Sequence, residues 1–340
     1  MKKDIRSFTI EELEEEVTSM AQPAHRARQI FLWLNGKGAS DFSEMSDLSK
    51  NFVTELKKKF YIEELKCEKH LTSADGTEKF LWKLKDGEHI ETVFISEGKR
   101  KTLCLSSQVG CKIKCCFCAS GIRGFIRNLE ASEIVSQVLQ VQKSSKFRIT
   151  NIVFMGMGEP FDNYDNVLKA IRIINHPAGI GIGARKITVS TCGITPAILK
   201  LAEEGLQVEL SVSLHAANNE LRNKLVPINR KYSLKDLLDC CMEYYRKTGR
   251  VITLEYALIK GCNDSMKDAD DLAAAAKRLK AKVNLIACNP YEDLSYEGPD
   301  KKHAGKFKDR LISLGITATL RKSKGSDILA ACGQLAAREG

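Results

Sequence analysis

The chain has 340 residues, of which 43% are hydrophobic and 28% are charged. This length suits about two domains of ordinary size, and the apolar fraction is enough to give each a buried core. A largely disordered chain is excluded, and so is a membrane-inserted one, because no apolar run approaches the roughly 18 residues that span a bilayer. Glutamates dominate residues 11–16, where a secretory signal would be apolar, so we expect the protein in the cytoplasm.

Charge and cysteine content further limit the classes of protein to which the chain could belong. The 53 Lys and Arg residues exceed the 43 Asp and Glu residues and give a net charge of +10, which attracts polyanions such as RNA without identifying one. A basic enzyme with no nucleic-acid role fits this charge about as well. The chain has 12 cysteines, and in the cytoplasm we expect thiols, metal ligands or catalytic groups rather than structural disulfides.

The first segment is predicted to be helical. Apolar residues recur at helical spacing from Thr9 to about Phe60. Thr9 and Asp47 are candidates for the residues that cap helix N-termini. The pattern therefore predicts a small helical domain over residues 1–62.

A β-hairpin is predicted next. Residues 79–84 and 90–95 alternate between apolar and polar side chains, as half-buried strands do. Asp86 and Gly87 between them are typical of a tight hairpin turn. We expect this hairpin to form an extension over residues 63–96.

Beyond Thr102 the pattern changes to short apolar strands that alternate with longer amphipathic helices. Six such units predict an α/β fold with a parallel sheet, either doubly wound or curved into a partial barrel, because helical crossovers join parallel strands. In both architectures the functional groups gather where strands end. The predicted strands are 102–105, 151–155, 186–190, 207–212, 251–258 and 282–287, and the predicted helices include 132–142, 166–174, 196–204, 234–245 and 269–279.

A cysteine-rich loop follows the first of these strands. Cys111, Cys115 and Cys118 have the spacing C-x3-C-x2-C. Three thiolates on one compact loop can bind three irons of an iron–sulfur cubane, and no fourth cysteine follows at a short spacing, so one iron would stay open for chemistry. Cys116 is interpreted as a loop residue because neighbouring side chains diverge. A four-ligand zinc site, an electron-transfer cluster with a distant fourth cysteine and a chance cysteine-rich loop are the alternatives.

This spacing, at the head of an array of strands and helices, resembles the radical S-adenosylmethionine (SAM) superfamily. Further segments resemble the RlmN family within it, and they extend the resemblance over the whole chain: 102–111, 124–129, 156–160, 189–193, 213–216 and 331–335. The resemblance implies a partial (β/α)6 radical SAM barrel over residues 97–331 and a segment at 332–340 that carries a catalytic cysteine. Members of this family methylate C2 of an adenine in 23S ribosomal RNA (rRNA) and, in some cases, in transfer RNA (tRNA).

The resemblance also implies a cofactor site. A [4Fe-4S] cluster on the three loop cysteines would leave its open iron for the amino and carboxylate groups of SAM. The SAM-binding positions match groups at the ends of successive predicted strands: Gly158, Glu159, Ser190, Ser213, Leu214, His215 and Asn289. Taken alone, each of them would more often be a turn residue, a strand-end cap or a satisfied histidine. Cys192 stands where a serine is expected and receives no role.

The implied reaction is a radical one that uses two SAM molecules per turnover, because C2 of adenine has no lone pair with which to displace a sulfonium methyl group. One SAM methylates the Cys332 thiolate, and the second supplies the 5′-deoxyadenosyl radical that activates this methyl group. Glu91 takes the position of the base that removes the C2 proton, and Cys104 attacks Cys332 to form a transient disulfide that releases the RNA. Without the resemblance, Glu91 would be interpreted as a solvated strand residue and Cys104 as core packing.

The implied partners are the RNA and an external one-electron donor such as flavodoxin. Three basic clusters could follow RNA phosphates, and the sequence does not choose among 57–59, 99–101 and 321–324. The alternatives are a related enzyme that methylates C8 of the same adenine, a basic RNA-binding protein with a structural metal site, and a radical SAM activator of another protein. Residues 124–129 resemble the C2 group more closely.

Overall fold

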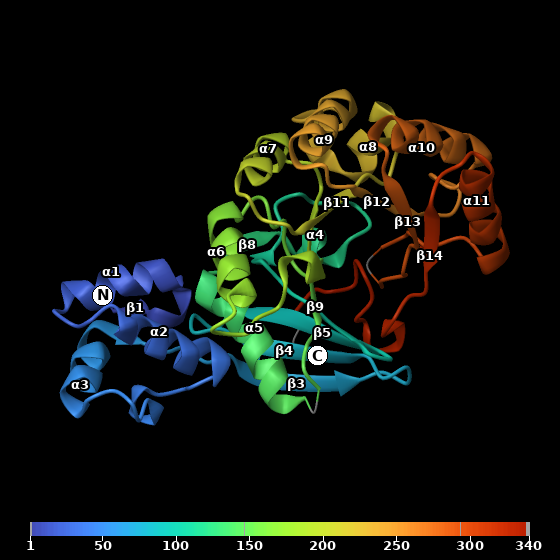
Figure 1. Cartoon of the computed structure of the whole chain (residues 1–340). Helices are drawn as coiled ribbons and strands as arrows, with labels where there is room; N and C mark the ends of the chain where they lie inside the picture. The colour runs from blue at the N-terminus through green and yellow to red at the C-terminus, as the bar shows by residue number, and fades with distance from the viewer. Residues whose placement is uncertain (1, 146, 293, 338–340) are drawn as a thin grey trace.

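The computed structural model describes residues 2–145, 147–292 and 294–337. A small helical lobe at the N-terminus lies beside the larger part of the molecule (Figure 1). The lobe contains α1 (Ile10–Ser19), α2 (His25–Phe31) and α3 (Lys50–Lys59), and its short strands β1 (Lys3–Asp4) and β2 (Phe60–Tyr61) pair in parallel. The predicted helical character of this segment is confirmed.

Of the two helix N-caps predicted in the lobe, one is confirmed. The Thr9 hydroxyl accepts a hydrogen bond from the Glu12 N–H, and the Glu12 carboxylate accepts one from the Thr9 N–H, which forms a capping box. The prediction for Asp47 is wrong, because Ser49 caps α3. The Asp47 carboxylate instead accepts a hydrogen bond of 2.6 Å from the indole of Trp33.

Within the described residues, one ten-stranded sheet forms the centre of the molecule, in the order β14-β13-β12-β11-β10-β9-β6-β5-β4-β3. The strands β3 (Lys66–Thr72), β4 (Glu78–Lys83) and β5 (His89–Glu97) are antiparallel and join β6 (Arg100–Cys104). The predicted hairpin is therefore confirmed, and Gly87 takes a positive φ of 89° in its turn. The outer strand β3 was not predicted, and its register shifts between Cys67 and Lys69.

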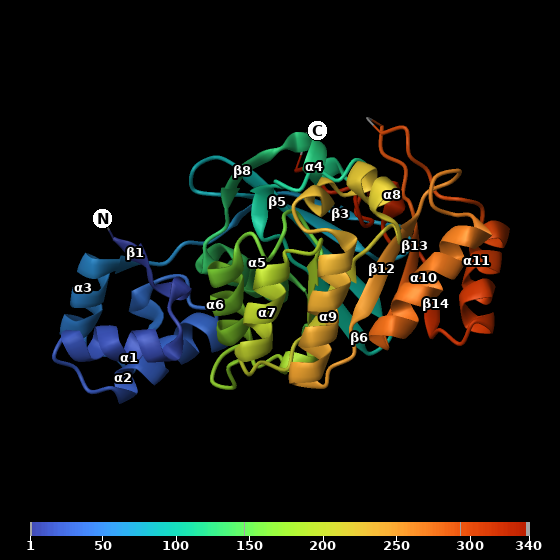
Figure 2. The ribbon, with the colours of Figure 1, turned by 90° about the horizontal axis from the view of Figure 1, so that it is seen from above.

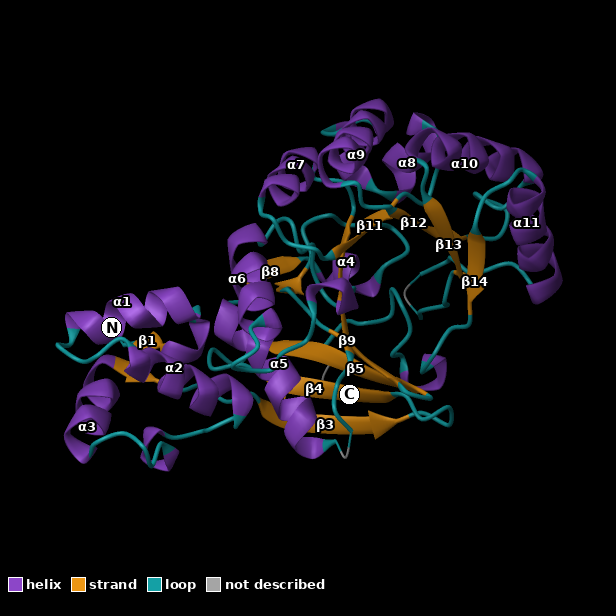
Figure 3. Cartoon of the chain, in the orientation of Figure 1, coloured by secondary structure: helices purple, strands orange, loops and turns teal. Residues whose placement is uncertain are grey.

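From β6 onwards all neighbouring strands of the sheet are parallel, as predicted. Figure 3 shows helices on the convex side of this curved part and the short helix α4 (Ala119–Arg123) on its concave side. The strands are β9 (Asn151–Phe154), β10 (Ile187–Thr191), β11 (Glu209–Ser213), β12 (Thr253–Leu258), β13 (Lys282–Ala287) and β14 (Ala318–Arg321). The helices are α5 (Ala131–Ser144), α6 (Tyr164–Asn175), α7 (Thr195–Glu203), α8 (Asn219–Leu225), α9 (Leu234–Thr248), α10 (Met266–Leu279) and α11 (Lys301–Ser313).

This arrangement corresponds to the partial barrel, the second of the two predicted architectures. Viewed from above, α6, α7, α9 and α10 stand in a row along one side of the strands (Figure 2). The strand β14, reached through α11, adds a seventh parallel strand to the six that the sequence predicts. The sheet stays open in the described residues, with β3 and β14 as its two edges.

The cysteine loop lies on the concave side, between β7 (Gln108–Gly110) and β8 (Phe125–Asn128), which pair antiparallel. Gly110 has a φ of 73°, and a Cβ atom there would lie 1.6 Å from the carbonyl oxygen of Gly124. Only glycine fits this crossing. The crossing brings both ends of the cysteine loop together.

The main apolar core runs without interruption from the lobe to the sheet. Buried Arg6 links the two parts, because its guanidinium donates to the carbonyl oxygen of Ala39 in the lobe and to the hydroxyl of Ser136 on α5. The predicted domain boundaries at residues 62, 96 and 331 stay predictions, and residues 338–340 of the predicted C-terminal segment lie outside the described residues. None of the helices in the described part is both long and apolar enough to cross a membrane.

Candidate active site

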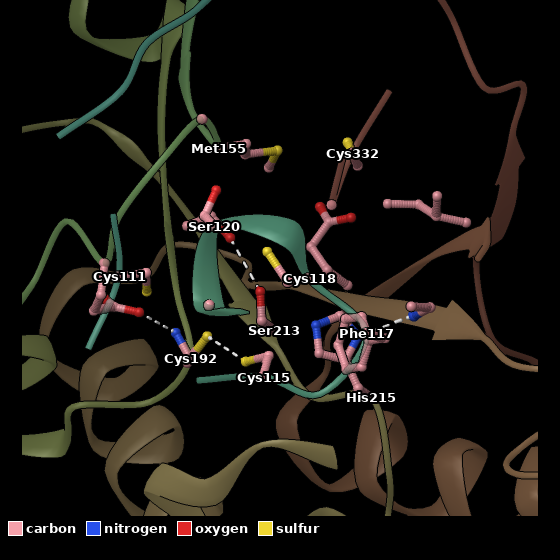
Figure 4. Close-up of a pocket in the computed structure, with 18 of the residues that line it drawn as sticks. Cys111, Cys115, Phe117, Cys118, Ser120, Met155, Cys192, Ser213, His215 and Cys332 are labelled. Carbon is pink, nitrogen blue, oxygen red and sulfur yellow. Dashed lines mark hydrogen bonds between the residues drawn. The ribbon is translucent and has the colours of Figure 1, made fainter. Parts of the chain in front are cut away.

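A cavity opens on the concave side of the sheet, where the parallel strands end (Figure 4). Its empty space of about 980 Å³ includes open solvent at its mouth. Most residues predicted to hold the cofactors line it: Cys111, Cys115, Cys118, Gly158, Glu159, Ser190, Ser213, His215 and Asn289. The fold therefore brings together side chains that are far apart in the sequence.

The three loop cysteines share this cavity but not a single-ion site. Among the described residues, no three His, Cys, Asp or Glu side chains lie close enough together to hold one metal ion. A cubane differs because each of its cysteines binds a different iron. Burial raises the pKa of the Cys111 and Cys118 thiols, and coordination to a metal is the interaction that holds such thiols deprotonated.

The buried positive charge of Arg222 bears on whether the site suits an anionic cluster. Its guanidinium is fully buried and donates to the carbonyl oxygens of Leu214 (3.0 Å) and Cys192 (2.7 Å) and to the side-chain oxygen of Asn229 (2.7 Å). All of these acceptors are neutral, and within the described residues Arg222 has no carboxylate at ion-pair distance. A buried charge without a counter-charge is strongly unfavourable. Arg222 lies within charge-interaction range of Cys115, so a cluster held by three thiolates would supply negative charge near this cation, and the residues present fit it.

Glu159 follows β9 and is buried. Its Oε1 accepts from the N–H of Phe161 (3.1 Å) and its Oε2 from the N–H of Cys192 (2.7 Å). Burial raises the pKa of this carboxyl group. Gly158 before it has a φ of 101°, and a Cβ atom there would lie 2.6 Å from the Gln108 side chain. Both residues therefore fix the backbone at the cavity wall, with Glu159 tying the β9 end to the β10 end.

Two of the predicted serines meet at the ends of neighbouring strands. The hydroxyl oxygens of Ser190 and Ser213 lie 3.4 Å apart, at the ends of β10 and β11. Leu214, the next residue, does not line the cavity, because its side chain is packed in the main core. A cofactor in this cavity would meet the serine hydroxyls directly, but not the leucine side chain.

His215 is buried in the same wall. Its Nδ1 accepts a hydrogen bond of 2.9 Å from the N–H of Ala257, and its ring meets Phe117 edge to face at 4.9 Å. Burial, with a smaller contribution from the charge of Arg222, lowers the pKa of His215 to about 3. The imidazole is therefore neutral at physiological pH.

Cys332 connects the first cavity to a second one. It lines the first cavity together with the loop cysteines, and it lines the neighbouring cavity together with Cys104 and Arg321. Its carbonyl oxygen accepts a hydrogen bond of 3.1 Å from the amide of Asn289. Burial raises the pKa of the Cys104 thiol to about 12, with a smaller contribution from Cys332. Both predicted reactive thiols thus border one space.

Glu91, the predicted base, lies elsewhere. It lines a third cavity, between the hairpin and the C-terminal segment. Its carboxylate pairs with the Lys79 ammonium at 2.8 Å and accepts hydrogen bonds from the N–H groups of Ala336 (2.8 Å) and Ala337 (2.9 Å). The structure therefore does not place this carboxylate in a cavity with Cys104 or Cys332.

Among the residues in the wall of the first cavity that were assigned no role from the sequence, Glu255 and Cys192 carry a carboxylate and a thiol. Glu255 on β12 is buried, and its Oε2 accepts a hydrogen bond of 2.6 Å from Asn284. The sequence signal that could have identified Glu255 is that it is the single carboxylate within the apolar run 251–258. Cys192 follows β10, and its sulfur lies 3.9 Å from that of Cys115.

Comparisons with known proteins agree with this geometry. Residues 105–273 match the model described as the radical SAM superfamily, and residues 3–62 match the ribosomal RNA large subunit methyltransferase N-terminal domain. The chain is 45% identical over 334 residues to a probable dual-specificity RNA methyltransferase RlmN of Clostridium novyi, with 98% of this chain and 97% of the relative covered. A relative of the same name from Thermotoga sp. strain RQ2 is 48% identical over 335 residues, with the same coverage.

A solved structure covers the whole fold. The crystal structure of a radical SAM methyltransferase from Sphaerobacter thermophilus superposes with a TM-score of 0.94 at 43% sequence identity, and it covers 99% of this chain and 100% of that one. The predicted radical SAM fold is therefore confirmed.

Proposed function

Because the chain belongs to the RlmN family of radical SAM RNA methyltransferases, we propose that it methylates C2 of an adenine in 23S rRNA through a methylated cysteine. The relatives are named dual-specificity enzymes, and tRNA is the second substrate that we propose. The observation that carries the proposal is the position of Cys332. Cys332 lines both the cavity of the loop cysteines and the cavity of Cys104.

Cys111, Cys115 and Cys118 would hold a [4Fe-4S] cluster in the first cavity. When bound there, the cluster and two SAM molecules supply a methyl group and a 5′-deoxyadenosyl radical in each turnover. Gly158, Glu159, Ser190, Ser213, His215 and Asn289 would form the SAM site, and Leu214 would support it from the core between Ser213 and His215. The neutral ring of His215 suits contact with a positively charged sulfonium compound, because it adds no competing charge.

Cys332 would act as the methyl acceptor and Cys104 as the thiol that later displaces the product from it. A thiolate is a good nucleophile toward a sulfonium methyl group, whereas the adenine carbon is not. Asn289 holds the backbone of Cys332 at the boundary of the two cavities. A disulfide between Cys104 and Cys332 would then close the cycle, and an external thiol would reopen it.

Glu91 would remove the C2 proton only after its carboxylate is uncovered. In the structure the N–H groups of Ala336 and Ala337 occupy one carboxylate oxygen and Lys79 the other. The C-terminal segment around these residues therefore has to move when RNA enters. Lys79 can stay in place beside the carboxylate.

Among the basic clusters, we propose 321–324 as the one that meets the RNA at the reaction site. Arg321, Lys322 and Lys324 line the second cavity together with both reactive thiols. Lys57 and Lys58 of the 57–59 cluster pair with acidic groups of the lobe, and Lys324 pairs with Glu97, so the shared cavity is what favours 321–324. We expect the enzyme to act in the cytoplasm, where its proposed RNA substrates are found, and to receive electrons from a flavodoxin-type donor.

The test starts with protein purified and reconstituted without oxygen. Iron and sulfide are counted, and 5′-deoxyadenosine is measured after dithionite and SAM are added, with Cys118→Ala as the inactive control. Zinc in place of iron, or a full cluster that does not react with SAM, would contradict the proposal and favour an RNA-binding protein with a structural metal site.

The second step identifies the product on 23S rRNA and on tRNA by mass spectrometry and NMR of the nucleosides. 2-Methyladenosine is expected, and 8-methyladenosine would instead assign the C8 reaction. Cys332→Ala is expected to abolish methyl transfer while it keeps the iron content. Intact turnover in that variant would favour an activator of another protein.

A further inference from the structure

Cys192 gives the cofactor site a fourth thiol that the proposed function does not use. It lines the same cavity as the three loop cysteines. Its sulfur lies 3.9 Å from that of Cys115, and the two side chains point toward each other (Figure 4). This distance is within the range of a hydrogen bond between sulfur atoms.

The fold fixes Cys192 from both sides of its backbone. Its N–H donates to the buried carboxylate of Glu159 at 2.7 Å, and its carbonyl oxygen accepts from the buried guanidinium of Arg222 at 2.7 Å. Both bonds involve groups that are normally charged, which makes them stronger than neutral hydrogen bonds. The backbone that carries the Cys192 side chain is therefore held in place beside Cys115 by the surrounding structure.

The geometry does not suit Cys192 as a fourth cluster ligand. Two thiolates on one tetrahedral ion lie roughly 3.8 Å apart for metal–sulfur bonds of about 2.3 Å. In a cubane, however, each cysteine binds a different iron. The iron bound by Cys115 would have its remaining positions filled by sulfides, so a second thiol at 3.9 Å from Cys115 would find no free position on that iron. The one open iron is the position already proposed for SAM.

We propose that Cys192 donates its S–H to the sulfur of Cys115 and thereby raises the reduction potential of the cluster. Once Cys115 is bound to iron its sulfur carries no proton, so of the two residues only Cys192 can donate. Hydrogen bonds to cluster sulfurs stabilise the added electron and are among the main determinants of cluster potential. Cys192 is thus a positioning residue, and the inference rests on the proposed function only in requiring the cluster.

The experiment is an anaerobic redox titration of reconstituted full-length protein, in which the EPR signal of the reduced cluster is followed with and without SAM. The variants are Cys192→Ala, which removes the donor, and Cys192→Ser, which replaces it with a hydroxyl. Cys288→Ala is the matched control, because Cys288 is a buried thiol in the same cavity whose own sulfur contact is to the carbonyl oxygen of Asn289. Iron and sulfide are counted in every sample.

The expected result is a more negative midpoint potential for Cys192→Ala at unchanged iron content. Cys192→Ser should return most of the shift, and Cys288→Ala should match the wild type. Equal potentials in all four proteins would overturn the proposal. Loss of iron in Cys192→Ala would also overturn it, because Cys192 would then be a ligand. A wild type that assembles no SAM-reactive cluster would instead contradict the proposed function, so the two failures can be told apart.

Discussion

Replacing Lys79 with Met is expected to destabilise the protein strongly, because Lys79 and Glu91 form a buried ion pair. Their charged atoms lie 2.8 Å apart, and the two side chains are only 11% and 6% exposed. Lys79 also donates to the carbonyl oxygen of Leu329 at 3.2 Å. Removing one partner of such a pair leaves the other charge buried and uncompensated, which typically costs about 3–5 kcal/mol.

This cost converts into a shift of the melting temperature. An unfolding entropy of about 2.1 cal/mol/K per residue gives roughly 0.7 kcal/mol/K for this chain, so Tm should fall by about 4–7 °C. Circular dichroism during heating measures the shift. The double variant Lys79→Met with Glu91→Gln should recover much of it, because the glutamine amide is neutral and its oxygen still accepts from Ala336 and Ala337.

Lys260→Met is the matched control. Lys260 pairs with Glu297 at 2.6 Å, but the two side chains are 64% and 62% exposed. Exposed pairs of this kind often contribute nothing measurable to stability. If Lys79→Met lowers Tm no more than Lys260→Met does, burial does not determine how much an ion pair contributes to stability here, and the reasoning is refuted.

Three further predictions concern the site. Cys104→Ala should leave RNA covalently attached to Cys332, which a denaturing gel shows as a shifted band. Free methylated RNA as the main product would contradict the role of Cys104 in releasing the RNA. Gly110→Ala should disrupt the β7–β8 crossing and the cysteine loop, since its Cβ would lie 1.6 Å from the Gly124 carbonyl oxygen, and iron content after reconstitution reports the loss. Because burial lowers the pKa of His215 to about 3, the unfolded chain binds one more proton than the folded one between about pH 6.5 and pH 3. The stability that His215 contributes is thus present above pH 6.5 and is lost as pH falls, by up to about 1.4 kcal/mol per pH unit. Urea unfolding at pH 7 and at pH 5 measures this loss, and the free energy of unfolding should fall less between the two pH values in His215→Asn than in the wild type.

The sequence predicts the parallel strands well because burial on both faces makes them short, nearly continuous apolar runs. The edge elements lack that signal. In β3 almost every side chain is exposed, and in β14 exposed and half-buried side chains alternate, so neither contrasts with a loop. Helix α11 was overlooked for a similar reason, since lysines and other polar residues dominate its sequence.

In the candidate site too, features set by local sequence can be predicted, whereas features set by long-range contacts cannot. The cysteine loop is predictable because its spacing is local and chemically specific. The surroundings of Glu91 are not, because Ala336 and Ala337, which donate to its carboxylate, lie about 245 positions further along the chain. Cys192 shows the same limit, since only the folded structure places it against Cys115.

The edge strand β3 is poorly suited to pairing with a strand of another molecule. An open sheet presents unpaired backbone groups along its outer strands, which can template pairing with another molecule and lead to aggregation. Here the exposed edge carries Lys66, Glu68 and Lys69, and its register shifts at the same place. Charged side chains and irregular pairing both disfavour the docking of a second strand. Strand β3 therefore ends this side of the sheet with an edge that a strand of a neighbouring molecule cannot easily extend.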